Sequence, residues 1–265
     1  QIELLDAVPC ADGATGGDDG SGGGGIAQAQ QVRCDAADHD GVPKGARVYV
    51  IEDWCTPAEE EYFLGRVYRP SGAVGDPWAL VSGRRVQAHG GEVHEKGMIA
   101  RPLPDWLGKL LKSVRETCGD DVFPANVQLN HALVNEYEPG GGIMPHQDGP
   151  LYFPGVAIAS LGASAVMRFT PHVGESPDAE GGAETAAMKP FGVWLPRRSL
   201  LFFDGAAYTK CLHGIESVTE DAVDGSVVNW RCAVDSCGEV RRREGTRVSV
   251  TCRNVLKVRK LLMFK

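Results

Sequence analysis

The sequence predicts a mainly β protein, an α+β chain whose core is a double-stranded β-helix, or jelly roll. Two observations indicate this fold. Short apolar runs separated by Gly, Pro and Asp turns fill the chain from residue 127 onward, and helical patterns occur only before them. A chain of 265 residues, 43% of them hydrophobic, can also bury a sizeable core. The strands are expected at residues 127–137, 142–147, 156–161, 165–170, 190–195, 199–203, 226–232, 246–252 and 254–259.

The first 45 residues are rich in Gly, Ala and Asp. Such a segment cannot bury enough apolar surface to offset its ordering entropy, so residues 1–45 are expected to be a largely disordered leader. An alternating run at residues 47–51 predicts the first strand. Residues 46–265 are therefore expected to form one domain.

Two helices are expected ahead of the strand-rich part. Thr56, Pro57 and Glu59 form a start signal: a capping residue, a proline in the first turn and a glutamate three residues after the cap. This helix should run to about Tyr68. For the second, Asp105 is the expected cap and Gly119 suits the end. Its apolar positions share one face and are Trp106, Leu107, Leu110, Leu111 and Val114.

Three stretches break this pattern. Residues 69–104 are rich in Gly and Pro, which predicts a loop-rich lid over a site. Residues 171–189 and 219–245 are long, polar and aperiodic, which predicts surface insertions.

The bulk properties exclude several classes of protein. No apolar run reaches the ~18 residues of a membrane span, and no secretory signal is visible. We therefore expect a soluble protein of the cytoplasm and/or nucleus. The eight cysteines include no C-x-x-C pair, so they are expected to be reduced packing residues, with Cys232 and Cys237 the pair to check for a bond.

The formal net charge of −8 disfavours a generic polyphosphate-binding surface. It leaves room for a local basic patch. Two candidates are Arg84–Arg85 and residues 241–243, which are all arginine, although a surface charge cluster is often only a solvated face.

The chemistry-bearing stretch follows a Pro-Gly-Gly-Gly turn at residues 139–142. His146 and Asp148 are two residues apart, so on a strand they point to the same side. His213 is the candidate third ligand; next to Gly214 it could also be a plain turn residue. Two histidines and one carboxylate with open coordination positions form the facial triad of non-haem Fe(II) oxygenases.

Such iron sites usually employ 2-oxoglutarate, whose distal carboxylate needs a fixed cation. Arg247, Ser249, Thr251 and Arg253 share one face of a strand, which places two guanidinium groups toward the barrel interior. The alternative is one core-facing arginine that bridges to an acidic residue. Arg231 is a competing candidate, but it has no second arginine in phase.

Asn135 and Tyr137 also share a face, on the strand before the glycine turn. Their amide and hydroxyl groups are suitable neutral donors for the same cosubstrate. The alternative for both is ordinary core polarity.

Taken in order, these motifs resemble the AlkB family of Fe(II)/2-oxoglutarate-dependent dioxygenases. The motifs are Asn135-x-Tyr137, His146-x-Asp148, His213 and Arg247-x5-Arg253. Residues 142–154 and 158–162 are most similar to the sixth-homologue subgroup of that family. The resemblance covers roughly residues 45–262.

The resemblance implies a role for each matching residue. His146, Asp148 and His213 would bind Fe(II). Arg247 and Tyr137 would hold the distal carboxylate of 2-oxoglutarate, while Asn135 and Arg253 would contact its metal-bound end. Ser249 stands where many family members carry asparagine, and its shorter side chain reaches less far toward the cosubstrate.

The implied activity uses Fe(II), 2-oxoglutarate and O2 to hydroxylate a C–H bond. On an N-methyl group this gives a hemiaminal that releases formaldehyde. The expected partners are alkylated DNA or RNA, with Arg84, Arg85 and His89 of the predicted lid holding phosphates and stacking on a base. Two alternatives remain open: a protein side-chain hydroxylase or demethylase on the same scaffold, and a non-catalytic module that binds nucleic acid or protein.

Overall fold

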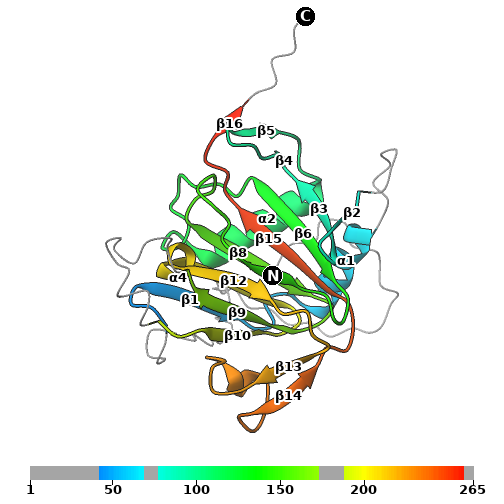
Figure 1. Ribbon diagram of the computed structural model, residues 1–265. Helices are drawn as coiled ribbons and strands as arrows, with labels where there is room; N and C mark the ends of the chain where they lie inside the picture. Colours follow the sequence, from blue (N-terminus) through cyan, green and yellow to red (C-terminus); the bar gives the residue numbers. More distant parts are fainter. Residues whose placement is uncertain (1–41, 69–76, 173–187, 260–265) are drawn as a thin grey trace, which may run out of the picture.

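Two antiparallel sheets form the centre of the computed structural model, which describes residues 42–68, 77–172 and 188–259 (Figure 1). The larger sheet has the strand order β1 (Ala46–Ile51), β11 (Ser199–Gly205), β8 (Gly155–Leu161), β15 (Arg247–Arg253), β6 (His131–Tyr137), β3 (Arg84–His89), β2 (Ala79–Val81). The smaller sheet has the order β10 (Phe191–Leu195), β9 (Ala165–Pro171), β12 (Cys211–Ile215), β7 (Ile143–His146). This arrangement confirms the predicted jelly roll.

The space between the two sheets is filled by aliphatic and aromatic side chains. Phe169 of β9 stacks on Phe191 of β10 with ring centroids 4.8 Å apart, and it meets Phe203 of the larger sheet edge-on at 5.1 Å. Side chains alternate along a strand, so β11 sends Leu201 and Phe203 into this core and the residues between them to the opposite face. Strand β11 is therefore buried on both sides, which explains its continuous apolar sequence.

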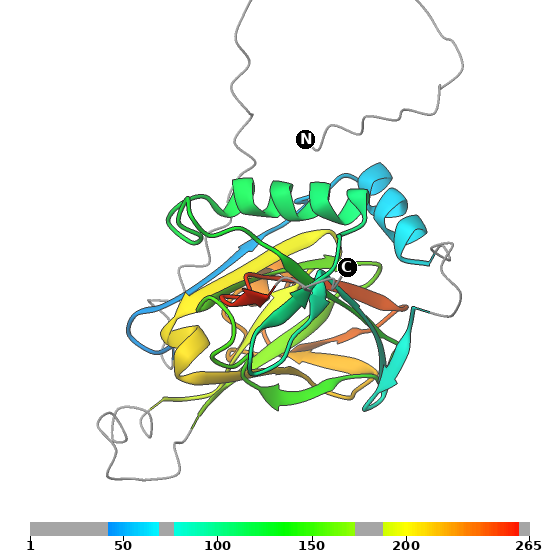
Figure 2. The same cartoon turned by 90° about the horizontal axis from the view of Figure 1, so that it is seen from above.

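Two helices, α1 (Pro57–Tyr68) and α2 (Asp105–Cys118), cover the outer face of the larger sheet (Figure 2). They form a second core against it, to which the helices contribute Phe63, Val67, Leu107, Leu110, Leu111 and Val114. The apolar stripe predicted for the second helix is thus the face that packs. A short helix, α4 (Ala206–Thr209), follows β11.

The helix ends match the sequence prediction at three of four points. At the start of α1, the Thr56 amide donates to Glu59 Oε2 at 2.7 Å and the Glu59 amide donates to Thr56 Oγ1 at 3.2 Å, which is the reciprocal capping predicted. Tyr68 ends this helix, and Gly119, with φ 71°, ends α2. The prediction that Asp105 caps α2 is wrong, because Pro104 occupies that position without a side-chain cap.

The segment predicted to be a loop-rich lid is half strand where it is described. Strands β2 and β3 extend the larger sheet beyond β6, and β4 (Gly91–Glu92) and β5 (Met98–Ala100) follow. Strand β5 pairs with the C-terminal β16 (Val258–Arg259), so β4, β5 and β16 form a separate small sheet. Residues 69–76 lie outside the described part of the chain.

The insertion predicted at residues 219–245 contains a hairpin, β13 (Glu220–Val223) paired with β14 (Glu239–Arg242). The strand predicted at residues 226–232 is wrong: a turn and the 3-10 helix η2 (Trp230–Cys232) occupy it. The hairpin packs against the outer face of the smaller sheet through a third apolar cluster. Most of the predicted insertion at 171–189 and nearly all of the predicted leader fall on residues 1–41 and 173–187, outside the described residues.

Two further predicted strands are shorter in the structure, and a further strand of the structure was not predicted. Strand β6 begins at His131 rather than at residue 127, and the run at 254–259 supplies only the two residues of β16. Strand β12 was not predicted, since a segment this short with a histidine and a glycine reads as a turn. Strand β12 is important for the site, because it carries His213.

All six described cysteines are free thiols: Cys55, Cys118, Cys211, Cys232, Cys237 and Cys252. Cys232 and Cys237 therefore form no bond with each other. Four of the six are buried, as expected of packing residues. None of the described helices combines the length and apolar character needed to cross a membrane.

Candidate functional site

His146, Asp148 and His213 come together at one end of the cleft between the sheets. One ligand atom from each lies within 4.8 Å of the others. Strands β12 and β7 pair so that His213 stands opposite His146, and their ring centroids are 4.4 Å apart. The triad predicted from separate motifs is thus assembled by a strand pairing that the sequence did not reveal.

The glycine turn before β7 is required by close packing. A Cβ on Gly142 would lie 2.4 Å from the Ile215 carbonyl oxygen, closer than any side chain can approach. Gly140 adopts φ 89°, a conformation that favours glycine. The turn therefore brings β7 against the end of β12 and fixes where His146 lies.

Both imidazole groups can offer a ring nitrogen to a metal. His213 is buried, and this burial lowers its pKa to about 3, so the ring is neutral near pH 7. His146 Nδ1 lies 3.0 Å from the Met144 carbonyl oxygen, which can only accept, so Nδ1 donates. This contact leaves the His146 Nε2 lone pair free for a ligand.

Arg253 orients the third member of the triad. Its Nε donates to Asp148 Oδ2 at 3.0 Å, and its Nη2 donates to Asp148 Oδ1. The guanidinium carbon lies 4.9 Å from the ring centroid of Tyr152, so the aromatic ring covers the pair. Arg253 is thus a core-facing arginine that bridges to an acidic residue, one of the two readings of the sequence.

Arg247 is different, because it has no acidic partner among the described residues. Its side chain is buried; Nη2 donates to Ser160 Oγ at 2.8 Å, but Nε has no hydrogen-bond partner. The guanidinium lies 5.6 Å from the ring centroid of Tyr137. Burial lowers the pKa of Arg247 to about 10, which still leaves it charged at neutral pH. A buried cation in this state is costly, and an anionic ligand would relieve that cost.

These groups share one cavity of about 240 Å³. Strand β15 contributes Arg247, Ser249, Thr251 and Arg253, and β6 contributes Asn135 and Tyr137, as their alternation predicted. The remaining lining residues are Arg84, Leu133, Ile143, His146, Gln147, Asp148, Tyr152, Ile158, Met167, His213 and Ile215. The cavity therefore has a metal-ligand end at Asp148 and a cationic end at Arg247.

Of the three residues predicted to contact substrate, the structure places only Arg84 in this cavity. Its Nε donates to Asn135 Oδ1 at 3.0 Å. Arg85 lies on the opposite face of β3, where it forms an ion pair with Glu136. His89 is also on that face, hydrogen-bonded to Gln87 and edge-on to Trp106. Because β3 is a strand, neighbouring side chains point to opposite sides, and this corrects the grouping of Arg85 and His89 with the site.

The other basic candidates do not reach the cavity. Arg231 in η2 lies over the ring of its neighbour Trp230, at 4.5 Å, so the preference for Arg247 is supported. Within the arginine run, Arg243 is buried in an ion pair with Asp221, and Arg241 donates to the Ala233 carbonyl. Two of the three arginines of this predicted patch therefore serve the hairpin itself.

Sequence reasoning missed Tyr152 and Ser160, the neighbours that Arg253 and Arg247 contact. Tyr152 lies between β7 and β8, where it forms an isolated bridge with Val255, and Ser160 is buried in β8. No spacing rule connects either residue with an arginine ~90 or more positions away, because the contact depends on strand pairing.

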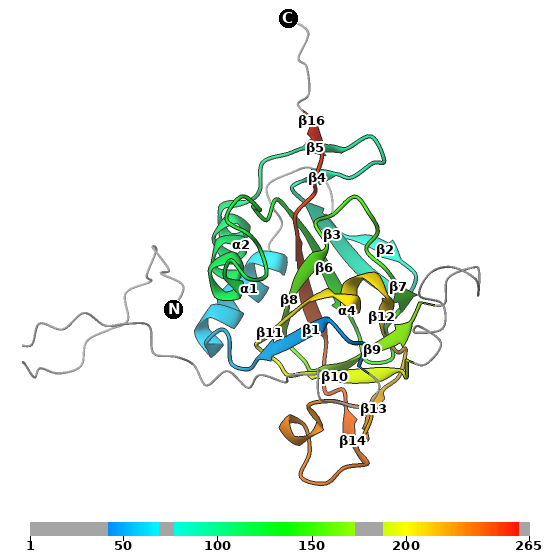
Figure 3. The same cartoon turned by 90° about the vertical axis from the view of Figure 1, so that its left-hand side faces the viewer.

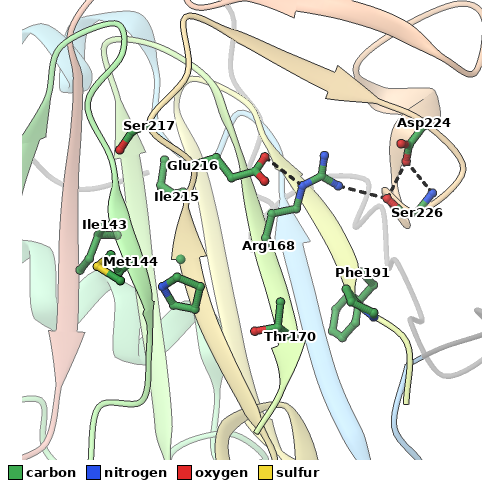
Figure 4. A pocket seen from close by; sticks show the side chains of 13 residues that line it. Ile143, Met144, Arg168, Thr170, Phe191, Ile215, Glu216, Ser217, Asp224 and Ser226 are labelled. Atoms are coloured by element: carbon green, nitrogen blue, oxygen red, sulfur yellow. Dashed lines mark hydrogen bonds and ion pairs between the residues drawn. The ribbon is translucent and has the colours of Figure 1, made fainter. Parts of the chain in front are cut away.

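A second hollow, of about 480 Å³, lies on the outer face of the smaller sheet (Figure 4). Arg168 crosses it and is held by Glu216 at 3.5 Å, by Ser226 at 3.1 Å and by the Ala222 carbonyl at 3.0 Å. The charge of Arg168 is thus balanced by Glu216. Unlike Arg247, Arg168 therefore does not need an anionic ligand.

Comparison with known proteins agrees with this geometry. Residues 52–253 match the model of the 2OG-Fe(II) oxygenase superfamily. The chain is 40% identical over 218 residues to "Probable RNA/DNA demethylase ALKBH6" of Danio rerio, covering 82% of this chain and 89% of that protein. It is 27% identical over 221 residues to "Alkylated DNA repair protein ALKBH8 homolog" of Arabidopsis thaliana, covering 78% of this chain and 58% of that protein.

Among solved structures, that of OsALKBH1 aligns with a TM-score of 0.45 and 17% identity, over 78% of this chain and 96% of that one. The family match and the 40% identical relative each span most of the chain. With a cavity that offers metal ligands at one end and an unpaired buried cation at the other, the chain belongs to the 2OG-Fe(II) oxygenase superfamily, as an AlkB-family dioxygenase that uses Fe(II), 2-oxoglutarate and O2.

Proposed function

We propose that residues 46–265 form one catalytic domain that removes alkyl groups from nitrogen atoms of nucleic acid by oxidation. The observation that carries the catalytic part is the cavity with His146, Asp148 and His213 at one end and Arg247 at the other. The substrate class is supported by the name of the zebrafish relative, an RNA/DNA demethylase. Arg84, a cation in the cavity wall, adds chemical support.

In this proposal, the triad holds Fe(II). Two imidazoles and one carboxylate suit a divalent iron and leave net positive charge for an anionic cosubstrate. Arg253 keeps the Asp148 carboxylate in a fixed orientation, since both of its oxygens accept from one planar guanidinium. Neither oxygen is then free to rotate away from the metal position.

The cosubstrate would lie between the two ends of the cavity. Arg247 and Tyr137 bind the distal carboxylate of 2-oxoglutarate, which would supply the partner that Arg247 Nε lacks. Asn135 and Arg253 contact the metal-bound end. Ser249, directly opposite Asn135 in the strand register, lies along the middle of the same wall.

When bound, iron and 2-oxoglutarate supply the oxidising power, with O2 as oxidant and succinate and CO2 as products. The protein supplies position. Arg247 would hold one end of the cosubstrate, and the cavity walls would limit the access of water. The alkyl group would approach the triad from the side that faces away from Arg247. Hydroxylation of an N-methyl carbon then releases formaldehyde.

Protein substrates are the second candidate for the same cavity. The net charge of −8 gives no general attraction for nucleic acid, and only one of the three predicted substrate contacts lines the cavity. The placement of Arg84 beside Asn135 favours an anionic substrate such as a nucleotide. The non-catalytic module is disfavoured because the triad and Arg247 are all in place.

The deciding experiment offers the enzyme two pools, one of N-methylated oligonucleotides and one of methylated peptides, with iron, 2-oxoglutarate and O2. Mass spectrometry reports demethylation, and succinate release reports turnover. We expect loss of methyl groups from the oligonucleotides, and none with His146→Ala. Demethylation or hydroxylation of the peptides alone would replace nucleic acid with protein as the substrate, and equal succinate release by His146→Ala would overturn the assignment of the iron ligands.

A further inference from the structure

After Arg253, at the metal end of the cavity, the chain continues to the small sheet that contains β16. Arg253, which holds Asp148, is the last residue of β15. Val255 then bridges to Tyr152 of the cavity wall, and Val258–Arg259 form β16 alongside β5. The small sheet of β4, β5 and β16 projects beyond the larger sheet, past the end of β15 (Figures 1 and 3). Arg253, at that end of β15, lines the cavity.

Three exposed cations gather on this projection: Lys96, Lys257 and Arg259, which we call the cationic ridge. Lys257 directly precedes β16, and Arg259 is the second residue of that strand. Both pack their stems against Gly97: a Cβ built there would lie 3.0 Å from Lys257 Cγ and 3.3 Å from Arg259 Cγ. Lys96 directly precedes this glycine.

The cations of the ridge lack an acidic partner in the part of the chain that the structure describes. None of the three forms an ion pair with a residue that the structure describes, whereas nearby Arg101 is paired with Glu92. The other charged neighbour is Glu95, in the turn between β4 and β5. The chain as a whole has a net charge of −8, so three unpaired cations close together make this surface locally positive on a negatively charged protein.

We propose that the cationic ridge binds the phosphate backbone of the nucleic acid whose alkylated base enters the cavity. This proposal rests on the function proposed above and adds the surface that holds the rest of the strand. The ridge makes contacts of charge to phosphate, which position the strand without reading its sequence. Its place beyond Arg253 lets a strand run from the metal end of the cavity onto β16.

The geometry sets a length for the strand. Arg259 lies six positions after Arg253, so at ~3.3 Å per residue Arg259 is at most about 20 Å from the metal end. A stacked strand advances about 3.4 Å per nucleotide, so about six nucleotides bridge this distance. A substrate much shorter than this spans less of the distance and makes fewer contacts with the ridge.

The test compares binding by two triple variants with the intact chain. The ridge variant carries Lys96→Ala, Lys257→Ala and Arg259→Ala. The matched control carries Lys44→Ala, Lys109→Ala and Arg242→Ala, three exposed cations elsewhere on the protein. Fluorescence anisotropy measures the affinity for a labelled single strand of about fifteen nucleotides, between about 50 and 200 mM salt.

We expect the ridge variant to flatten the slope of log affinity against log salt by about 2, since each lost phosphate contact contributes about 0.7. Its affinity at the lowest salt should fall at least tenfold, on the order of what such a slope change implies. The control variant loses the same net charge and should keep the slope. Binding and demethylation of a strand of about three nucleotides should be equal in all three proteins.

Equal salt slopes for the ridge variant and the intact protein would overturn the proposal, as would a complete failure of the intact protein to bind the strand. Vesicles containing phosphatidylserine test the other source of phosphate. A ridge-dependent loss of vesicle binding with unchanged oligonucleotide binding would assign the surface to lipid instead. If the ridge binds the strand but no oligonucleotide is demethylated, the ridge stands and the proposed reaction fails.

Discussion

Arg253 donates two hydrogen bonds to the carboxylate of Asp148, one from Nε at 3.0 Å and one from Nη2. The acidic side chain is only 2% exposed, so its orientation is set by this one partner and by the burial of both groups. Such an outer partner usually decides how well a ligand binds its metal.

Replacing Arg253 by lysine should therefore weaken metal binding by about 10–100-fold, because a lysine ammonium cannot occupy both oxygens in a fixed plane. The measurement is titration with Fe(II) under anaerobic conditions without 2-oxoglutarate, which separates this effect from cosubstrate contacts. Arg197→Lys is the control: that arginine pairs with the buried Glu60, far from the cavity. Equal metal affinity in the Arg253 variant and the intact chain would contradict the role.

Replacing Arg247 by methionine should leave the stability of the ligand-free protein unchanged or raise it. The buried guanidinium has no acidic partner among the described residues, so removing its charge removes a desolvation cost. The same variant should raise the KM for 2-oxoglutarate by two orders of magnitude or more, on the scale of a lost buried charge pair. Urea denaturation and succinate assays provide the two measurements.

Arg243→Met is the matched control for that experiment. Arg243 is equally buried, but it is paired with Asp221 and also donates to the carbonyl groups of Gly141 and Glu216. Its loss leaves a buried carboxylate alone and should destabilise the fold by about 3–5 kcal/mol. If both variants lose stability to the same degree, Arg247 is a structural residue like its neighbour.

Gly142→Ala should separate the two histidine ligands. The added Cβ would lie 2.4 Å from the Ile215 carbonyl oxygen, so β7 must move away from β12. We expect a loss of about 1–3 kcal/mol in stability, together with weaker metal binding. Gly108→Ala in α2 meets nothing within 4 Å and should instead stabilise by about 0.5–1 kcal/mol. Unchanged metal affinity in Gly142→Ala would show that the turn does not set the ligand spacing.

His131 should make stability depend on pH. Burial, and then the charge of Arg253, lower its pKa to about 4 in the folded protein, compared with 6.5 for a free side chain. Between these values the unfolded chain binds a proton that the folded protein excludes, so stability falls as pH falls from 6.5 toward 4. The contribution is at most about 1.4 kcal/mol per pH unit. His131→Gln should flatten the dependence by that amount; an unchanged profile would mean that His131 is already protonated.

The elements that depend on local sequence could be predicted. Thr56 and Glu59 signal the first helix within four residues, and the spacing of His146 and Asp148 predicts that they share a site, although Asp148 lies just beyond the end of β7. The alternation that aligns Arg247 with Arg253 is equally local. These predictions need no knowledge of which strands are neighbours.

What the sequence concealed was strand pairing. His213 reads as a turn residue because only the pairing of residues 211–215 with β9 and β7 shows that they form a strand. The glycines and prolines of residues 69–104 suggested loops, yet β3 gains a partner in β6, 43 or more residues later. Once β3 is known to be a strand, the opposite orientations of Arg84 and Arg85 follow at once.

Strand β7 is the outermost strand of the smaller sheet, so one of its two edges has no neighbour in that sheet. An open edge is where a foreign strand can add, and aggregation often begins there. Pro145 removes one N–H donor from this strand, which makes such addition unfavourable. The proline between Met144 and His146 thus protects the ligand-bearing strand from self-association while leaving its histidine free to serve the metal.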